Sequence, residues 1–251
     1  MTDFESWIEA LTARHQSDLT FSEISRSLRA LSSTYVERRH RLREGAALSG
    51  AGKRAAFALF YGPLHFLTIT AIVRALGPQE RRLTTIHDLG CGTGVGGAAW
   101  ALASGTPATI AGIDRNPWAV AEANWTYRQL ELRGTARAGD IAAGPRLQIP
   151  GSQDSGILLA YSVNELPDAA RAALLDRIAD AAARGSALLV VEPIAKRDRR
   201  WWPAWASRLA PAGVVEHEWR FPADLPPLLR DLARSAGLDP RELTARTLSR
   251  H

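Results

Sequence analysis

The sequence predicts an α/β protein built around a doubly wound, mostly parallel β-sheet, with a helical region in front of it. Two observations predict the sheet. From Thr84 onward, short β-branched and apolar runs alternate with helix-like segments, which is typical of repeated βαβ units with right-handed crossovers. Two of these runs, GILLAYS and SALLVVEP, are continuously apolar, as expected of strands buried on both faces. At 251 residues and 46% hydrophobic content, the chain can bury a substantial core.

The first 80 residues read as helical throughout. Near the N-terminus, apolar residues recur at the spacing of one helix face, at Phe4, Trp7, Ile8 and Leu11. The stretch TFSE at residues 20–23 has the spacing of a capping box. A later apolar segment is interrupted by Gly62 and Pro63, where we expect the helix to break or kink. We therefore predict a helical accessory or lid region over residues 1–80 and a sheet domain over residues 81–251.

Within the sheet domain, local patterns give the order of the elements. The predicted strands are TIHDLG, TIAGID, GILLAYS and SALLVVEP, and TARAGD is assigned as a strand mainly from its place in the alternation. Helix patterns cover residues 95–104, 117–132 and 168–184. The last of these begins at Pro167 and Asp168 and stops before Gly185, so its start and stop signals have the favoured order.

Composition narrows the classes of partner and site. The net charge is +5, and all but two of the 31 basic residues are Arg. This either reflects genome base composition or favours phosphate and carboxylate partners, nucleic acid included. No apolar run approaches the roughly 18–20 residues that span a bilayer, and the N-terminus lacks a signal region, so we expect a cytoplasmic protein without a membrane partner. The single cysteine, Cys91, excludes an internal disulfide and a multi-cysteine metal site, and we predict no metal.

The first strand ends in a glycine-rich turn, which contains Gly90, Cys91, Gly92 and Gly94. Sheets of this kind bind ligands where the strand order reverses, and glycines let a ligand approach the backbone closely. The spacing from Gly92 to Gly97 also matches the dinucleotide fingerprint, which leaves a nicotinamide cofactor open. Asp88, just before the turn, would oppose a pyrophosphate but suits a ligand with an ammonium and a sulfonium, such as S-adenosylmethionine. Alternatively, Asp88 only bonds to nearby loop amides.

Two further acids end the next two strands. Asp114 can accept both hydroxyls of a ribose, and Arg115 follows it. Trp118 either lies against an adenine or packs its helix on the sheet. Asp140 can accept an adenine amino group, with Ile141 flanking the ring, or it caps its own loop. Three acids at three successive strand ends indicate a cationic nucleoside far more specifically than any one of them does.

The fourth strand runs into the segment 161–168, whose start faces the transferred group in a sheet of this order. The candidates for the acceptor site are Tyr161, which also lies beside the cofactor, Asn164 and Glu165. Glu165 can take a proton or orient an amine, and Asn164 can hold an acceptor by its amide. Alternatively, both residues cap the following helix. In-line positioning alone can supply most of the barrier reduction.

The motifs HDLGCGTG, GIDRNP and AGDI resemble the first three motifs of class I S-adenosylmethionine-dependent methyltransferases, over residues 84–192. The resemblance implies a methyltransferase enzyme with S-adenosylmethionine as cofactor. It also implies a seven-stranded Rossmann-like sheet with an antiparallel last strand. The segments GVVEHEWRF and LTARTLSRH are candidates for the final pair of strands, with a helix at LPPLLRDLARSAGL between them.

A second resemblance concerns RALSSTYVERR, NELPD and EPI, which are similar to segments of the small-ribosomal-subunit methyltransferase-like family, over residues 25–193. The chain departs from that family twice. The family's cysteine cluster has no counterpart, and Tyr61, Gly62 and Pro63 stand where the family has Arg-x-Pro. Tyr61 and His65 lie on the segment expected to cover the cofactor pocket, where either can touch the acceptor or the cofactor carboxylate. Alternatively, His65 is an ordinary packing residue.

Two basic segments bear on the acceptor. The segment 195–205 mixes basic residues with tryptophans, which can hold phosphate and stack bases, or form a solvated turn before an anchored helix. The run from Arg38 to Arg43 can equally be an exposed helix face. The sequence therefore predicts methyl transfer to a nitrogen or oxygen acceptor, with a small molecule only slightly favoured over RNA. The alternatives are an rRNA methyltransferase, a non-catalytic ribosome-assembly or RNA-binding protein, and, least favoured, a nicotinamide-dependent oxidoreductase.

Overall fold

The computed structural model describes residues 4–37, 48–78, 82–105, 107–143, 149–194 and 200–250. The chain forms two compact units. The first comprises Met1–Leu67 and Phe221–Leu243, and the second comprises Thr68–Arg220 and Thr244–His251. The domain division expected at residue 80 stays a prediction.

The first unit is helical. Its elements are α1 (Phe4–His15), α2 (Phe21–Glu37), α3 (Ala51–Ala56), the π-helical turn Phe57–Tyr61 and α9 (Pro227–Ala236). The predicted capping box is confirmed, because the Thr20 backbone N donates to Glu23 Oε2 at 2.8 Å and the Glu23 N donates to Thr20 Oγ1 at 3.3 Å. Helix α9 lies against α2, where the hydroxyls of Ser25 and Ser235 are 2.6 Å apart.

The segment around Pro63 differs from the sequence prediction, since the chain stays helical from Ala51 to the end of α4 (Gly62–Leu76). A π-helical turn lies just before the proline, and there the Gly62 N donates to the Phe57 carbonyl, five residues earlier. This wider turn accommodates a residue that has no N–H of its own, so the predicted break is wrong. By length and composition alone, this 26-residue helix could cross a membrane, contrary to the expectation above, but 61% of its most apolar window is buried, as in a core helix.

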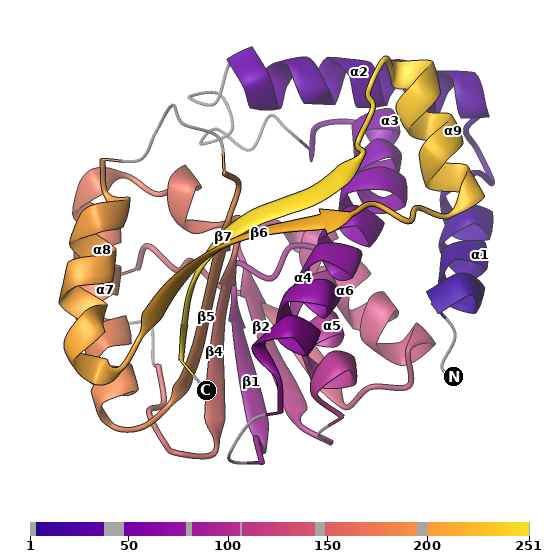
Figure 1. The fold of residues 1–251 in the computed structure, drawn as a ribbon. Helices are drawn as coiled ribbons and strands as arrows, with labels where there is room; N and C mark the ends of the chain where they lie inside the picture. The colour runs from indigo at the N-terminus through magenta and orange to yellow at the C-terminus, as the bar shows by residue number, and fades with distance from the viewer. Residues whose placement is uncertain are drawn as a thin grey trace. The chain divides into compact units, whose positions relative to one another are not determined.

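The second unit carries the sheet, and its strand order is β3-β2-β1-β4-β5-β7-β6 (Figure 1). The strands are β1 (Thr85–Leu89), β2 (Thr109–Asp114), β3 (Gly134–Ala138), β4 (Ser155–Ala160), β5 (Ala187–Glu192), β6 (Val215–Pro222) and β7 (Glu242–Arg250). Strands β1 to β5 pair in parallel, and β7 pairs antiparallel with β5. The predicted doubly wound, seven-stranded, mostly parallel sheet is therefore confirmed, including its last two strands and the helix between them.

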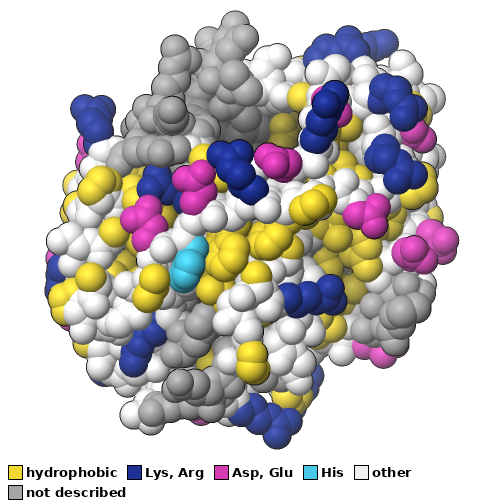
Figure 2. Space-filling model, viewed as in Figure 1, with side chains coloured by type: hydrophobic (Ala, Val, Ile, Leu, Met, Phe, Trp, Pro, Cys, Tyr) yellow, Lys and Arg dark blue, Asp and Glu magenta, His cyan; other side chains and the backbone are white. Residues whose placement is uncertain are grey.

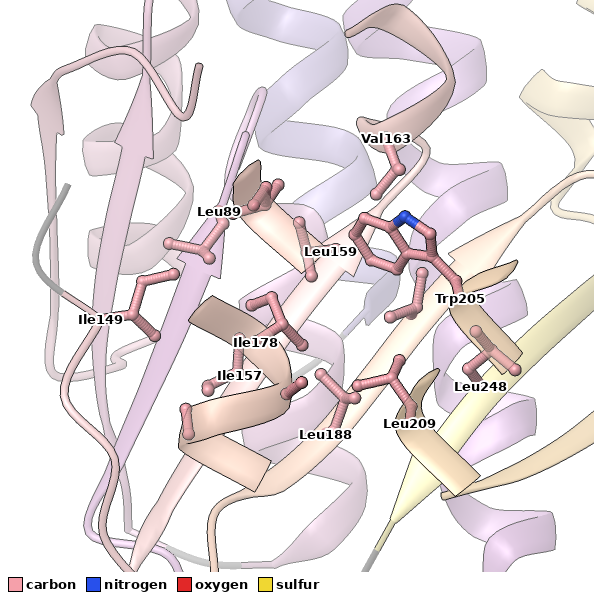
Figure 3. Close-up of a cluster of buried hydrophobic side chains, with 14 of the residues drawn as sticks. Leu89, Ile149, Ile157, Leu159, Val163, Ile178, Leu188, Trp205, Leu209 and Leu248 are labelled. Carbon is pink, nitrogen blue, oxygen red and sulfur yellow. The ribbon is translucent and has the colours of Figure 1, made fainter. Parts of the chain in front are cut away.

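The remaining helices follow the predicted alternation. They are α5 (Val95–Ser104), α6 (Pro117–Gln129), α7 (Asp168–Ala183) and α8 (Trp202–Leu209). Helix α6 ends three residues earlier than predicted, shortly before Glu131 takes a left-handed conformation with φ 52°. Helices α7 and α8 pack on the sheet through a cluster of buried apolar side chains that includes Ile157, Ile178, Leu188 and Trp205 (Figure 3). This core holds the carboxyl ends of β4 and β5 in fixed positions.

Candidate cofactor and acceptor site

The strand order reverses at β1, which has β2 on one side and β4 on the other. Asp88, near the end of β1, lies in register with Gly112 of β2 and Leu158 of β4. The carboxyl ends of these parallel strands therefore meet at one edge of the sheet. Asp114 ends β2 at that edge, and Asp140 follows β3 by two residues. The structure thus brings the three predicted acids to the edge where ligands bind in such sheets.

The glycines of the turn are not equivalent, although Gly90, Gly92 and Gly94 all have left-handed φ values of 77°, 51° and 79°. A Cβ atom on Gly90 would lie 2.7 Å from the Cβ of Ser162, and one on Gly94 would lie 2.8 Å from the Tyr127 ring. A Cβ on Gly92 would meet no atom within 4 Å. Gly90 and Gly94 are therefore needed for packing, whereas the Gly92 backbone faces open space that a ligand can enter.

Asp88 is buried, with 1% of its surface exposed, and its Oδ2 accepts a hydrogen bond from the Gly97 amide of α5 at 2.8 Å. Burial raises the pKa of Asp88 to about 7, the Gly97 bond opposes this rise, and the nearby Asp114 charge adds to it. This bond to a backbone amide agrees with the alternative interpretation, in which Asp88 only bonds to nearby amides. Direct contact between Asp88 and a cofactor stays a prediction.

Asp114 fastens the glycine turn to β2. Its Oδ2 accepts from the Gly92 amide at 2.9 Å, and its Oδ1 accepts from the Asn116 amide at 2.8 Å. Each carboxylate oxygen has a second lone pair, so the same group can still accept from a ribose hydroxyl. Arg115 is exposed beside it, and Trp118 is partly buried in the first turn of α6. Asp114 therefore shapes the turn, and its binding of a nucleoside stays a prediction.

The third predicted acid and the turn cysteine are placed differently. Asp140 is exposed, and its Oδ1 accepts from the Ala142 amide at 2.8 Å, so the loop-capping contact is present. Ile141 beside it is buried. Cys91 is also buried, and burial together with the carboxylates of Asp88 and Asp114 raises the pKa of its thiol well above the usual range. The thiol therefore stays neutral and lines the turn as a small apolar group.

Tyr161 begins the loop that the sequence predicts to meet the acceptor, residues 161–166, directly after β4; it is called the acceptor loop below. Its φ of 58° is unusual for an aromatic residue, and such strain is often found at functional sites. The backbone N donates to the Val191 carbonyl at 2.8 Å, and the phenol hydrogen-bonds to the side chain of Thr68. Burial raises the pKa of Tyr161. The phenol is therefore protonated and held in one place.

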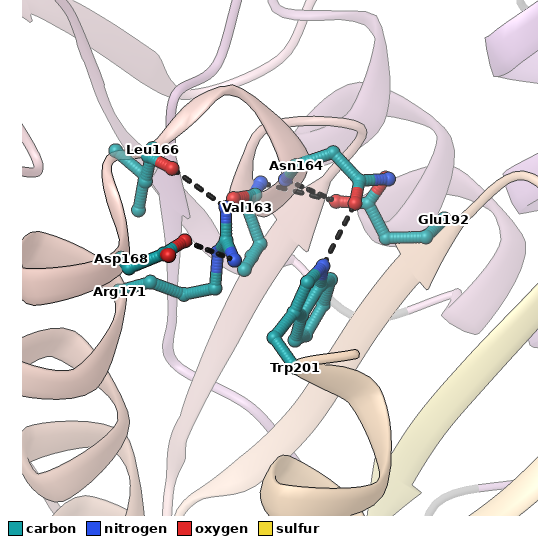
Figure 4. Close-up of polar contacts among 7 residues, drawn as sticks. All are labelled: Val163, Asn164, Leu166, Asp168, Arg171, Glu192 and Trp201. Atoms are coloured by element: carbon teal, nitrogen blue, oxygen red, sulfur yellow. Dashed lines mark hydrogen bonds and ion pairs between the residues drawn. The ribbon is translucent and has the colours of Figure 1, made fainter. Parts of the chain in front are cut away.

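Asn164 is held by two residues that the sequence analysis did not assign (Figure 4). Its Nδ2 donates to Glu192 Oε2 at 2.5 Å, and its Oδ1 accepts from Trp201 Nε1 at 2.8 Å. Glu192 Oε1 also accepts from the backbone amides of Val163 and Asn164. Helix α7 has Pro167 at its N-cap and no side-chain cap, so capping by Asn164 or Glu165 is wrong.

Glu165, the next residue, lies near Arg115 at the end of β2, with 4.0 Å between its Oε2 and an Arg115 guanidinium nitrogen. About a third of its side chain, 37%, is exposed. Burial of the rest raises the pKa of Glu165 to about 7, Arg115 opposes this rise, and Asp114 adds to it. A partly exposed carboxyl with a pKa near neutrality has the properties of a general base.

Sequence reasoning missed Glu192, Trp201 and Arg171. A signal for Glu192 is present in the sequence, because it is the acid of the EPI segment and ends β5 as Asp114 ends β2. Arg171 had no signal, since it looks like an ordinary helix residue. The structure buries it and bonds it to the carbonyls of Val163 and Leu166 and to Asp168.

Tyr61 and His65 belong to the first compact unit, and their roles stay predictions. Burial raises the pKa of Tyr61 and lowers that of His65 to about 3, so both are neutral at pH 7. The basic run 38–43 and residues 195–199 lie outside the described residues. Among the residues that the structure describes, no group of three or more His, Cys, Asp or Glu side chains could hold a metal ion.

Gly92 and Gly94 allow a matched test of how each glycine contributes to stability. Gly94→Ala combines a left-handed backbone with a clash against Tyr127 and Ala123, so we expect it to lower the free energy of unfolding by about 2–4 kcal/mol. Gly92→Ala carries the backbone strain alone and should cost only about 1 kcal/mol. Urea denaturation measures both. Equal losses would contradict the distinction between the two positions.

Asp88 gives a pH test of stability. Its folded pKa of about 7 lies above its ordinary value of 3.8, so the folded state binds the proton more tightly. The resulting stabilisation is complete below pH 3.8 and disappears as the pH rises through 7, by up to about 4 kcal/mol. In Asp88→Asn this component is absent. Denaturation curves at pH 4 to 8 should show wild type losing stability relative to the variant, and parallel curves would refute the buried, protonated carboxyl.

Comparison with known proteins identifies the fold. No family model matches the chain, and no curated protein sequence matches it. An O-methyltransferase family protein from Burkholderia thailandensis matches with a TM-score of 0.59 at 17% identity, over 96% of this chain and 76% of its own. The mitomycin 7-O-methyltransferase MmcR matches with a TM-score of 0.54 at 17% identity, over 96% of this chain and 71% of its own. The chain therefore has the fold of class I S-adenosylmethionine-dependent methyltransferases, including a helical N-terminal region.

Proposed function

We propose that this chain is an enzyme that transfers a methyl group from S-adenosylmethionine to a nitrogen or oxygen atom of a small-molecule acceptor. The observation that carries the proposal lies at the reversal of strand order. The left-handed Gly92 faces open space, and its amide is bonded to Asp114, a partly buried carboxylate. A ligand with ammonium and sulfonium groups is attracted to this edge, whereas the pyrophosphate of a dinucleotide would be repelled.

The described residues fit such a nucleoside. A ribose would lie against Asp114, and an adenine would lie between Trp118 and Ile141 with its amino group toward Asp140. The methionine end would approach the backbone of Gly92, where no side chain intervenes. These assignments follow from the position of each residue along the carboxyl edge of the sheet.

Glu165 supplies the acid–base chemistry of the proposal. When bound, S-adenosylmethionine supplies an electrophilic methyl group, which passes to a lone pair of the acceptor atom as the C–S bond breaks. An acceptor N–H or O–H must then lose its proton, and Glu165 takes it, because a carboxyl with a pKa near 7 is largely ionised above neutrality. The nearby Arg115 guanidinium favours the ionised form of that carboxylate.

The packing of the tryptophans favours a small acceptor over RNA. Trp202 and Trp205 are each only 2% exposed, so their faces are not available to stack on bases. Trp201 donates its indole N–H to Asn164. Among the described side chains on the face shown in Figure 2, Lys and Arg are interspersed with Asp and Glu. An RNA acceptor, or RNA binding without transfer, is therefore an outcome that the experiments below must exclude.

Calorimetry with S-adenosylmethionine and S-adenosylhomocysteine tests the cofactor. Asp114→Asn should weaken binding about tenfold or more, because it removes a charged acceptor. Gly92→Ala should also weaken binding while leaving the protein folded, since its Cβ would occupy the open space. Asp176→Asn is the matched control, because Asp176 is an exposed acid on α7 paired with Arg208, and its affinity should equal wild type. Binding of NAD in preference to S-adenosylmethionine would overturn the proposal.

Labelled methyl transfer tests the acceptor and the base. Purified protein is given S-adenosylmethionine labelled in its methyl group, with a bacterial metabolite extract in one arm and total bacterial RNA in the other. We expect label in the metabolite arm, with a rate that rises with pH through about 7 as Glu165 loses its proton. Glu165→Gln should lower that rate at least tenfold and abolish the rise. Label in RNA alone, or RNA binding without label, would support the alternatives.

A further inference from the structure

The amide of Asn164 is used inside the protein. Its oxygen accepts from the Trp201 indole, and its nitrogen donates to Glu192. An indole N–H can only donate, so Trp201 alone requires the Asn164 oxygen on its side and leaves the amide nitrogen facing Glu192. Burial raises the pKa of Glu192 to about 8, and above that pH its carboxylate can only accept. Figure 4 shows the Asn164 side chain between the two partners. We call these three residues the Asn164 clamp.

Both ends of the clamp are fixed by packing. Glu192 ends β5 and is buried, with 2% of its surface exposed. The Trp201 ring meets the rings of the buried Trp202 and Trp205 at centroid distances of 5.3 and 5.1 Å. The guanidinium of Arg171 lies 5.4 Å from the Trp201 ring centre and also binds the Val163 and Leu166 carbonyls. The clamp therefore joins the acceptor loop to β5, α7 and α8.

The clamp determines where Glu165 can lie. Residues 163–165 form a single 3₁₀ turn, so fixing Asn164 fixes the backbone of its neighbour. On the β1 side the loop is also fastened, because the Ser162 hydroxyl donates to the Leu89 carbonyl at 3.1 Å. Glu165 is left with a partly exposed side chain near Arg115, at the cofactor edge.

We propose, building on the function above, that Glu192, Asn164 and Trp201 are positioning residues that hold Glu165 at the reacting edge, and that Asn164 does not bind the acceptor itself. This assigns the predicted acceptor role of the loop to Glu165 alone. It also gives the acid of the EPI segment a role, as the anchor of the loop.

Exchanging the hydrogen-bond donor and acceptor of the Asn164–Glu192 pair tests this proposal. In Glu192→Gln, the introduced amide N–H group faces another N–H donor, so one hydrogen bond is lost. In Asn164→Asp, the introduced carboxylate faces the Glu192 carboxylate, and the two like charges repel each other. In the double variant Glu192→Gln/Asn164→Asp, the introduced amide donates to the introduced carboxylate, whose other oxygen still accepts from Trp201.

Each single variant should lower the labelling rate of the metabolite extract at least tenfold at pH 9, where Glu192 and Glu165 are ionised. The double variant should recover to within about threefold of wild type. Affinity for S-adenosylmethionine should change less than threefold in all of them.

Unfolding temperatures of the same four proteins give a readout that needs no acceptor. The double variant should lose less than the two single losses added together, by several degrees. Recovery in both measurements supports the clamp. A double variant as slow as the poorer single variant would show that the Asn164 amide itself meets the acceptor, and unaffected single variants would show that no clamp operates; either overturns the proposal.

The remaining outcomes are also decisive. If the single variants fail to fold, a folded double variant supports the clamp and an unfolded one overturns it. Trp201→Phe, which keeps an aromatic ring but removes the indole N–H donor together with part of the ring system, should fold and slow the labelling. If wild type itself binds no S-adenosylmethionine, the proposed function fails, whereas the unfolding temperatures still decide whether the clamp exists.

Discussion

The hydrogen bonds of the Asp114 carboxylate are the interaction on which the rest of the site depends. One oxygen holds the Gly92 amide and the other holds the Asn116 amide, so a single side chain joins the glycine turn of β1 to the start of α6. Without that connection, the left-handed turn would have fewer restraints on a conformation that few residues tolerate. The parallel sheet makes the connection possible, because it brings the ends of β1 and β2 to the same edge.

The loop after β4, proposed to meet the acceptor, is held in the same way by different residues. The loop after β4 is fastened to β1 through Ser162, to β5 through Glu192 and to α7 through Arg171. The side chains that make these bonds are buried in or next to a well-packed core. The packing gives the loop the rigidity that a reacting group needs. The strained Tyr161 backbone belongs to this arrangement, since it turns the chain sharply out of the strand.

Much of the fold could be predicted from the sequence, because the spacing of apolar residues shows which face of each helix or strand is buried. The alternation of apolar runs and helix patterns gave the order of the sheet elements, and TFSE gave the capping box. The π-helical turn before Pro63 could not be predicted, since its hydrogen-bonding pattern depends on packing around residues 57–61. For the site, the position of the three acids at the carboxyl edge of the sheet could be predicted, because each follows directly from the strand pattern. Trp201 and Arg171 were not found, because their contacts join segments far apart in sequence.

The central claim is that the carboxyl edge of β1, β2 and β3 binds S-adenosylmethionine, and amide hydrogen exchange tests it most directly. On addition of S-adenosylmethionine, the account predicts slower exchange in residues 90–97, 114–119 and 139–142, and little change at the opposite edge, in residues 82–85 and 152–155. Protection elsewhere, or none at a concentration that saturates class I methyltransferases, would contradict the account.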